Sequence, residues 1–167
     1  MSADNCKEVI VRRQIEELKL DQGFWYLATP YTKWWAGLDD AAQQAAIVAG
    51  GLTKRGLTVY SPIVNTHIIG LACNLDMRDA EMWLAAERPM AACAHGILVA
   101  NMLGWDKSYG VGKEREWFYL ASKPSYLIDV DAWTAEGLAY AVQLSANGGS
   151  DVLVAENQER SRCGNRG

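Results

Sequence analysis

The sequence predicts an α/β fold with a doubly wound parallel sheet of about five strands and helices on both faces. Short apolar segments of strand length alternate along the chain with longer segments of helical pattern. Continuous apolar runs are typical of strands that are buried on both faces, as in a parallel sheet. The length of 167 residues fits one domain with a full hydrophobic core.

Five apolar runs form the predicted strands. The first ends at Thr29-Pro30-Tyr31 and the second at Ser61-Pro62, where proline removes a backbone donor and interrupts regular pairing. The five runs are 24–28, 57–60, 96–101, 124–129 and, at an edge of the sheet, 152–155.

Helical patterns separate these runs, at 41–54, 75–92, 113–121 and 132–144. We expect Asp39 or Asp40 to cap the first helix and Pro89 to kink or end the second. The stretch 63–74 mixes His67 with apolar residues, and it is expected to be an irregular loop or a short helix over the site.

The two ends of the chain are expected to lie outside this fold. Residues 1–22 are predicted to form an N-terminal helical arm, because apolar residues between 6 and 20 fall unevenly around a helix. The α/β domain then spans 23–150. The tail at 151–167, rich in Asn, Arg, Ser and Gly, is expected to be flexible.

Composition excludes several classes of function. A net charge of −4 argues against binding to a nucleic acid polymer, which needs a basic face. No apolar run approaches the length of a membrane span, and the polar N-terminus does not resemble a signal peptide, so a cytoplasmic protein is expected. The four cysteines are widely spaced and are expected to be reduced thiols. Neither a metal site nor a cofactor is predicted.

The predicted topology brings three loops together, because the loops after neighbouring parallel strands meet at one edge of the sheet. These loops are 29–31, 61–67 and 103–114. The last contains a hydroxyl, two glycines and a carboxylate, at Ser108, Gly110, Gly112 and Glu114, where a helix begins. This pattern predicts a site for an anion and a nucleophile. Alternatively, the glycines only form a turn and Glu114 only caps the helix.

Four segments together resemble the nucleoside 2-deoxyribosyltransferase superfamily, and especially its branch of nucleotide N-glycosidases that remove the base from a nucleoside 5'-monophosphate. The resemblance covers roughly 24–130, and Ser-x-Gly-Val-Gly-x-Glu is its most specific element. The segments are Tyr-Leu-Ala-Thr-Pro-Tyr at 26–31, Val-Tyr-Ser-Pro-Ile at 59–63 with Thr66 and His67, Asp-Ala-Glu-Met-Trp at 79–83, and Gly-Trp-Asp-Lys-Ser-Tyr-Gly-Val-Gly-Lys-Glu at 104–114.

This resemblance implies a flavodoxin-like sheet, a homodimer or higher homo-oligomer, and a small-molecule nucleotide as substrate. Glu114 falls on the family's nucleophile, which attacks the anomeric carbon and forms a covalent glycosyl intermediate. Asp79 falls on the aspartate that contacts the base or assists its protonation, with Asp76 as the alternative. Ser108 matches a hydroxyl that binds the 5'-phosphate. A glutamate near the start of a helix has its anionic form favoured, which suits a nucleophile.

Further residues are expected to bind the substrate. Gly110 and Gly112 let the backbone approach a phosphate, and Tyr31 contacts the sugar. The first loop lacks the glycines, serine and arginine with which the family binds phosphate, and Lys33 is a possible replacement for the arginine. The other expected ligands of the substrate are Thr29, Ser61, His67, Asp76 and Trp83.

Two other functions stay open at this point. A deoxyribosyltransferase would exchange one base for another, and a non-catalytic module would bind or sense a nucleotide through the same loops. The residues do not identify the base, because pocket shape and one or two polar groups decide it.

Overall fold

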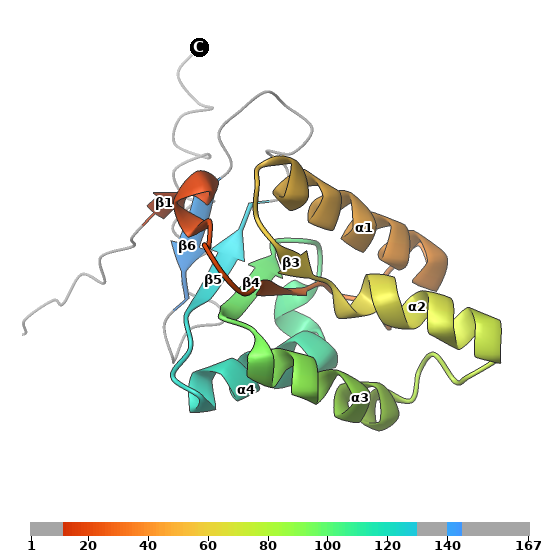
Figure 1. Ribbon diagram of the computed structural model, residues 1–167. Helices are drawn as coiled ribbons and strands as arrows, with labels where there is room; N and C mark the ends of the chain where they lie inside the picture. Colours follow the sequence, from red (N-terminus) through yellow and green to blue (C-terminus); the bar gives the residue numbers. More distant parts are fainter. Residues whose placement is uncertain (1–11, 130–139, 145–167) are drawn as a thin grey trace, which may run out of the picture.

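The computed structural model describes residues 12–129 and 140–144, and its centre is a parallel sheet between helices (Figure 1). Four strands form the parallel part, in the order β3-β2-β4-β5. Their bounds are β2 Trp25–Ala28, β3 Val59–Tyr60, β4 Gly96–Ala100 and β5 Ser125–Ile128. The α/β fold class and the strands predicted at 24–28, 57–60, 96–101 and 124–129 are therefore confirmed, with four parallel strands instead of five. The strand predicted at 152–155 lies outside the described residues.

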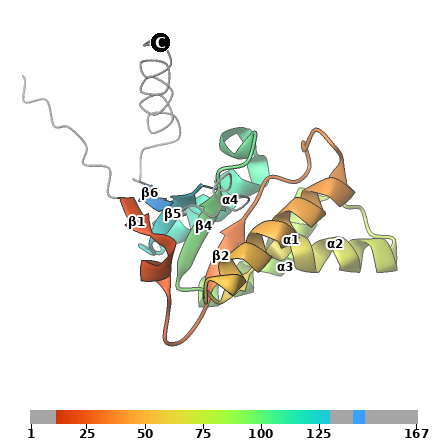
Figure 2. The same cartoon turned by 90° about the horizontal axis from the view of Figure 1, so that it is seen from above.

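Helices cover both faces of the sheet, as predicted (Figure 2). Successive side chains of a strand point to opposite faces, so Leu98 of β4 packs on the side of α1, and Ile97 and Val99 pack on the side of α3 and α4. The helices are α1 Leu38–Lys54, α2 Pro62–Cys73, α3 Ala80–Cys93 and α4 Tyr109–Leu120, with short 3-10 turns at η1 Ile15–Leu18 and η2 Trp105–Lys107. The sheet thus has an apolar core on each side.

The prediction of a helix over 132–144 is wrong at its end, because Tyr140–Gln143 forms strand β6, antiparallel to β5. The backbone N–H and C=O groups at the open edge of β5 gain partners through this pairing, which outweighs the weak local preference for a helix. Ala141 is buried there against the core. Residues 130–139 lie outside the described part of the chain.

The prediction of an N-terminal helical arm is also wrong for the residues that the structure describes. Arg12–Gln14 forms strand β1, antiparallel to β6, and η1 follows it. Ile15 and Leu18 are buried in the core, and the indole nitrogen of Trp25 donates to the carbonyl oxygen of Leu18 at 2.7 Å. This segment therefore belongs to the main fold, because its apolar residues gain more by burial on the sheet than by forming a separate helix. Residues 1–11 and the tail at 151–167 lie outside the description.

The start of α1 differs from the prediction. Gly37, not Asp39 or Asp40, is the N-cap, and its φ of 97° lies in the region that glycine adopts without strain. Both aspartates lie in the first turn, where a negative charge still stabilises the helix. The Asp40 carboxylate accepts a hydrogen bond of 2.6 Å from the Trp34 indole nitrogen.

Two helices, α2 and α3, occupy most of the stretch 63–92. The stretch 63–74 is helical, since α2 begins with a proline at Pro62 and ends at Asn74 in a left-handed conformation. α3 begins only at Ala80, five residues later than predicted at 75–92, because Asp79 caps it. Pro89 lies inside α3 without ending it.

Gly96 at the start of β4 is expected to be intolerant of any side chain. A Cβ atom there would lie 2.6 Å from Cζ3 of Trp25 and 2.8 Å from Cγ of Pro124, and it would also collide with the Pro124 carbonyl oxygen. We expect Gly96→Ala to lower the free energy of unfolding by about 1–3 kcal/mol, measured by urea denaturation. Gly50→Ala is the control, because Gly50 lies in α1 with open space around it, and that variant should gain about 0.5–1 kcal/mol. Equal stability of the two variants would contradict this packing argument.

Candidate active site

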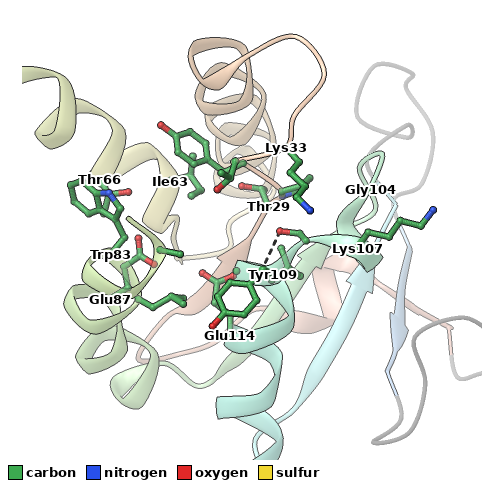
Figure 3. A pocket seen from close by; sticks show the side chains of 18 of the residues that line it. Thr29, Lys33, Ile63, Thr66, Trp83, Glu87, Gly104, Lys107, Tyr109 and Glu114 are labelled. Carbon is green, nitrogen blue, oxygen red and sulfur yellow. Dashed lines mark hydrogen bonds between the residues drawn. The ribbon is translucent and has the colours of Figure 1, made fainter. Parts of the chain in front are cut away.

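A cavity of about 370 Å³ opens where the parallel strands β2 and β4 end (Figure 3). Its walls come from the loop after β2, from α2 and α3, and from the loop and helix after β4. Doubly wound sheets bind ligands at the carboxyl ends of their strands, so this is the expected place for a site. The volume falls in the range of small-molecule pockets.

Two buried carboxyl groups meet at the bottom of this cavity. Glu114 of α4 and Glu87 of α3 both line it, and each is only 4% exposed. The hydroxyl of Tyr26, from β2, donates to Oε1 of Glu114 at 2.7 Å and lies 3.4 Å from Oε2 of Glu87. One hydroxyl therefore stands between two carboxyl groups, each on a different helix.

The local sequence explains why Glu87 is buried. Leu84 and Ala91 are also buried in α3, and spacings of three and four residues put all three on the same face of the helix. Sequence reasoning missed Glu87. A charged residue on the apolar stripe of an amphipathic helix was the signal that could have found it.

Burial changes the charge state of these carboxyl groups. Loss of solvent raises the pKa of Glu87 to about 7, although hydrogen bonds from Thr66 and Tyr26 oppose the shift. Burial, together with the charge of Glu87, raises the pKa of Glu114 well above its usual range, and the Tyr26 hydrogen bond again opposes this. The pair therefore resists a second negative charge and keeps one proton near neutral pH.

The expectation that a helix N-terminus lowers the pKa of Glu114 is wrong. Glu114 is the sixth residue of α4, beyond the first turn, and complete burial outweighs any helix dipole at this position. Burial and the charge of Glu114 also raise the pKa of Tyr26, so its hydroxyl stays protonated and remains a donor.

The other end of the cavity can receive an anion. Ser108 is the N-cap of α4, and its hydroxyl oxygen accepts a hydrogen bond from the Val111 amide at 3.5 Å. Gly110 lies in the first turn of α4, where helices bind anions through free N–H groups. The exposed side chains of Lys33 and Lys107 line the same mouth, and Figure 3 shows them on the side of Glu114 opposite to Trp83 and Glu87.

A family model matches residues 23–130, and its description is "Domain of unknown function (DUF1937)". The chain belongs to this family. The DUF1937 match includes the four parallel strands, all four α-helices of the described residues and the carboxyl pair, whereas β1 and β6 lie outside it. A search of curated proteins finds no match.

Within this DUF1937 domain, Thr29 and Tyr31 line the cavity as expected, and His67 does not. The buried ring of His67 has Nδ1 2.7 Å from the Tyr31 hydroxyl and Nε2 3.3 Å from Oδ1 of Asp39. The two ring nitrogens link the Tyr31 hydroxyl on one side to the Asp39 carboxylate on the other. His67 thus orients Tyr31 from behind the cavity wall. The Thr29 hydroxyl is buried without a hydrogen-bond partner among the described residues.

The predicted residues of α3 lie at its start, further from the carboxyl pair. Asp79 is exposed and accepts a hydrogen bond of 3.0 Å from the Met82 amide as the cap of α3. Asp76 is exposed too, and it accepts from the Arg78 amide at 2.9 Å. Neither aspartate lines the cavity, whereas Trp83 does.

Two further predicted residues are not brought into the cavity. Ser61 is buried as the N-cap of α2, and Gly112 faces a separate hollow beside Arg115 and Lys123. The predicted glycine loop is instead the first turn of α4, because the Ser108 cap starts the helix before both glycines. Ser108, Gly110 and Glu114 therefore share the cavity, and Gly112 lies outside it.

The described ranges 12–129 and 140–144 hold no group of three or more His, Cys, Asp or Glu side chains that could bind a metal ion. Nor does any helix there combine the length and apolar character that crossing a membrane requires.

Proposed function

We propose that this protein hydrolyses the N-glycosidic bond of a ribo- or deoxyribonucleoside 5'-monophosphate and releases the free base and a sugar phosphate. The observation that carries the proposal is Glu114, a buried carboxyl at the bottom of a cavity, hydrogen-bonded by Tyr26 and next to an anion-binding helix start. The resemblance to nucleotide N-glycosidases assigns the nucleophile to the same residue.

The reaction that we propose is a displacement at the anomeric carbon. Glu114 attacks this carbon while the bond to the base breaks, and the oxocarbenium character of the sugar is stabilised by the nearby carboxylate. Water then releases the sugar phosphate from the ester. The 2.7 Å hydrogen bond from Tyr26 supports this role, because a donor at that distance favours the ionised form of Glu114 and fixes its orientation.

The phosphate is expected at the start of α4. Ser108 offers a hydroxyl, the first turn offers N–H groups, and Lys33 and Lys107 offer positive charge at the mouth. A sugar held there by its 5'-phosphate directs its anomeric carbon inwards, towards Glu114. The base then meets Trp83, Ile63 and Thr66, a largely apolar wall on which an aromatic ring can stack.

Lys107 provides a test of the phosphate position. We expect Lys107→Ala to raise KM for a nucleoside monophosphate by about 10-fold or more, because a charged hydrogen bond to the substrate is lost, with a smaller change in kcat. For the corresponding nucleoside, which lacks the phosphate, KM and kcat of Lys107→Ala should be close to those of the wild type. Lys54→Ala, at the exposed end of α1, is the control. Equal losses with nucleotide and nucleoside would place the phosphate elsewhere.

The function itself is tested by incubating the protein with each ribo- and deoxyribonucleoside monophosphate, modified bases included, and measuring free base by chromatography. Release without an added base supports hydrolysis. Exchange with a labelled base that is faster than hydrolysis would instead identify a deoxyribosyltransferase. Binding in a thermal-shift assay without release or exchange would identify a non-catalytic nucleotide-binding module.

We also propose a cytoplasmic homodimer. Cys73 and Cys93 are exposed free thiols, which supports a reducing compartment. Exposed apolar side chains such as Ile68 and Leu71 on α2 and Leu103 beside the cavity support self-association. Analytical ultracentrifugation should show twice the monomer mass. A monomer at micromolar concentration would contradict the proposed homodimer.

A further inference from the structure

The carboxyl pair raises a question that a single nucleophile does not answer. Glu87 is 4% exposed, lines the same cavity as Glu114, and shares the hydroxyl of Tyr26 with it. Burying a carboxyl costs stability, since burial penalises its ionised form, and a catalytic role would explain why Glu87 lies here. Figure 3 shows Glu87 beside Trp83 and Thr66, on the side where the proposed function puts the base.

The distances fit a pair that acts on one carbon atom. Oxygens that lie 2.7 and 3.4 Å from the same hydroxyl are at most about 6 Å apart, a bound that includes the roughly 5–5.5 Å between the two carboxyl groups of glycosidases that use a nucleophile and an acid/base. Asp79, the aspartate that the resemblance favours for the proton, caps α3 and does not line the cavity.

We propose that Glu87 is the acid and base of the reaction, and that Tyr26 transfers its hydrogen bond between the two carboxyl groups as the negative charge moves. This inference rests on the proposed function. It adds a second catalytic residue, which touches the base and the attacking water, and a positioning residue between the two carboxyls.

In the first step, the bond from the Glu114 oxygen to the anomeric carbon forms as the carbon–nitrogen bond breaks. The electron pair of that bond goes to the base, and the proton of Glu87 goes to a nitrogen of the base. Glu114 becomes a neutral ester and Glu87 a carboxylate. The Tyr26 hydroxyl then has its stronger acceptor in Glu87, so its proton turns from Glu114 to Glu87.

In the second step, the oxygen of a water molecule bonds to the anomeric carbon, and the ester bond breaks. Its electron pair returns to Glu114 and the water proton goes to Glu87, so the starting state is restored after one water is consumed. The pair carries one negative charge in each state, in keeping with its resistance to a second. Burial favours the proton on Glu114 in the empty site; in the bound state the shared proton lies on Glu87, because the positive charge that develops at the anomeric carbon favours the ionised form of Glu114.

The groups that face Glu87 determine how it titrates. Tyr26 approaches from β2, Tyr60 from β3, Glu114 from α4 and the Thr66 hydroxyl from α2. Both tyrosines have a raised pKa because of burial, so the carboxyl pair is the part that titrates near neutral pH. The rate of the wild-type protein should therefore fall as pH rises through about 7, where Glu87 loses the proton that it donates to the base.

The experiment compares Glu87→Gln with the wild type on two substrates. One is the nucleoside monophosphate that the wild type cleaves, and the other is 4-nitrophenyl 5-phospho-β-D-ribofuranoside, whose phenolate leaves without a proton. We expect kcat/KM of the variant to fall about 100-fold or more on the nucleotide and less than about 10-fold on the nitrophenyl compound. The fall in rate at high pH should be lost in the variant. Glu81→Gln, an exposed residue of the same helix, is the control.

Each outcome decides a different question. No base release by the wild type from any nucleotide would overturn the proposed function. Equal losses on both substrates, with the high-pH fall retained, would overturn the role of Glu87 and leave the proposed function intact. If the wild type cleaves the nucleotide but not the nitrophenyl compound, the pH profile on the nucleotide decides the role of Glu87. Loss of the high-pH fall in Glu87→Gln supports that role, and its retention overturns it. If Asp79→Asn, and not Glu87→Gln, loses much more activity on the nucleotide than on the nitrophenyl compound and also loses the high-pH fall, the proton donor is Asp79.

Discussion

Glu114→Gln should lower base release from a nucleoside monophosphate by about 1,000-fold or more, because an amide cannot act as the nucleophile at the anomeric carbon. The substitution keeps the size of the side chain and lets its amide oxygen accept the hydrogen bond of the Tyr26 hydroxyl. Binding should survive, since the phosphate and the base are held elsewhere in the cavity. The rate is measured by chromatography of the base, and binding by the ligand-induced rise in Tm.

The matched control is Glu116→Gln, which makes the same chemical change two residues along α4. Glu116 is exposed and pairs with Lys113 at 2.9 Å, so its loss should change the rate by less than about twofold. A wild-type sample mixed rapidly with substrate should also gain the mass of one sugar phosphate, and the gain should be absent from Glu114→Gln. Retention of most of the activity in Glu114→Gln would rule out a covalent intermediate on this residue.

Glu87→Gln should make the protein more stable at pH 8, by about 1–3 kcal/mol of unfolding free energy. The pKa of Glu87 rises from the ordinary 4.5 to about 7 on folding, which corresponds to at most about 3 kcal/mol. Part of this gain is offset, because the new amide group needs a hydrogen-bond acceptor. A gain of this size corresponds to a Tm several degrees higher.

The direction of this stability change follows from the linkage between proton binding and folding. The folded protein binds the Glu87 proton more tightly than the unfolded chain does, so the contribution of Glu87 to stability is greatest below about pH 4.5 and falls as pH rises to about 7. Glu87→Gln removes this fall, so the two proteins should differ little at pH 4 and most at pH 8. Urea denaturation at both pH values measures the difference, with Glu81→Gln as the control. A variant that is less stable than the wild type at pH 8 would show that the surroundings of Glu87 stabilise its ionised form in the folded state.

These two variants separate stability from function at one site. Loss of a carboxyl that the fold holds at a cost should give a protein that is more stable but less active, as expected for functional residues. A carboxyl that served only to hold the fold together would give the opposite result, with lower stability and unchanged chemistry.

Much of the fold could be predicted from the sequence. The four parallel strands lie in apolar runs, and burial on both faces, as in β2 and β4, makes such runs the strongest signal of a parallel sheet. The antiparallel side of the sheet was predicted wrongly, at Arg12–Gln14 and Tyr140–Gln143. These two strands are short and form because a neighbouring strand offers unpaired backbone groups, and a local pattern does not show that neighbour.

The candidate site divides in the same way. Ser108, Gly110 and Glu114 lie next to one another in sequence, so their place at one helix start was predictable, and the structure brings them to one cavity with Thr29 and Tyr31. Glu87 was missed, although it lies on the buried stripe of α3. Asp79, which the resemblance favoured, caps that helix and lies outside the cavity lining.

The sequence by itself determined the order of the elements and the chemistry of the loop before α4, because both depend on residues a few positions apart. Only the tertiary structure decided which carboxyls meet and what charge they carry. Tyr26 is 61 residues from Glu87 and 88 from Glu114, and the packing of α3 and α4 on one face of the sheet brings the three together. Burial and mutual repulsion then set their pKa values, and both arise only when the chain has folded.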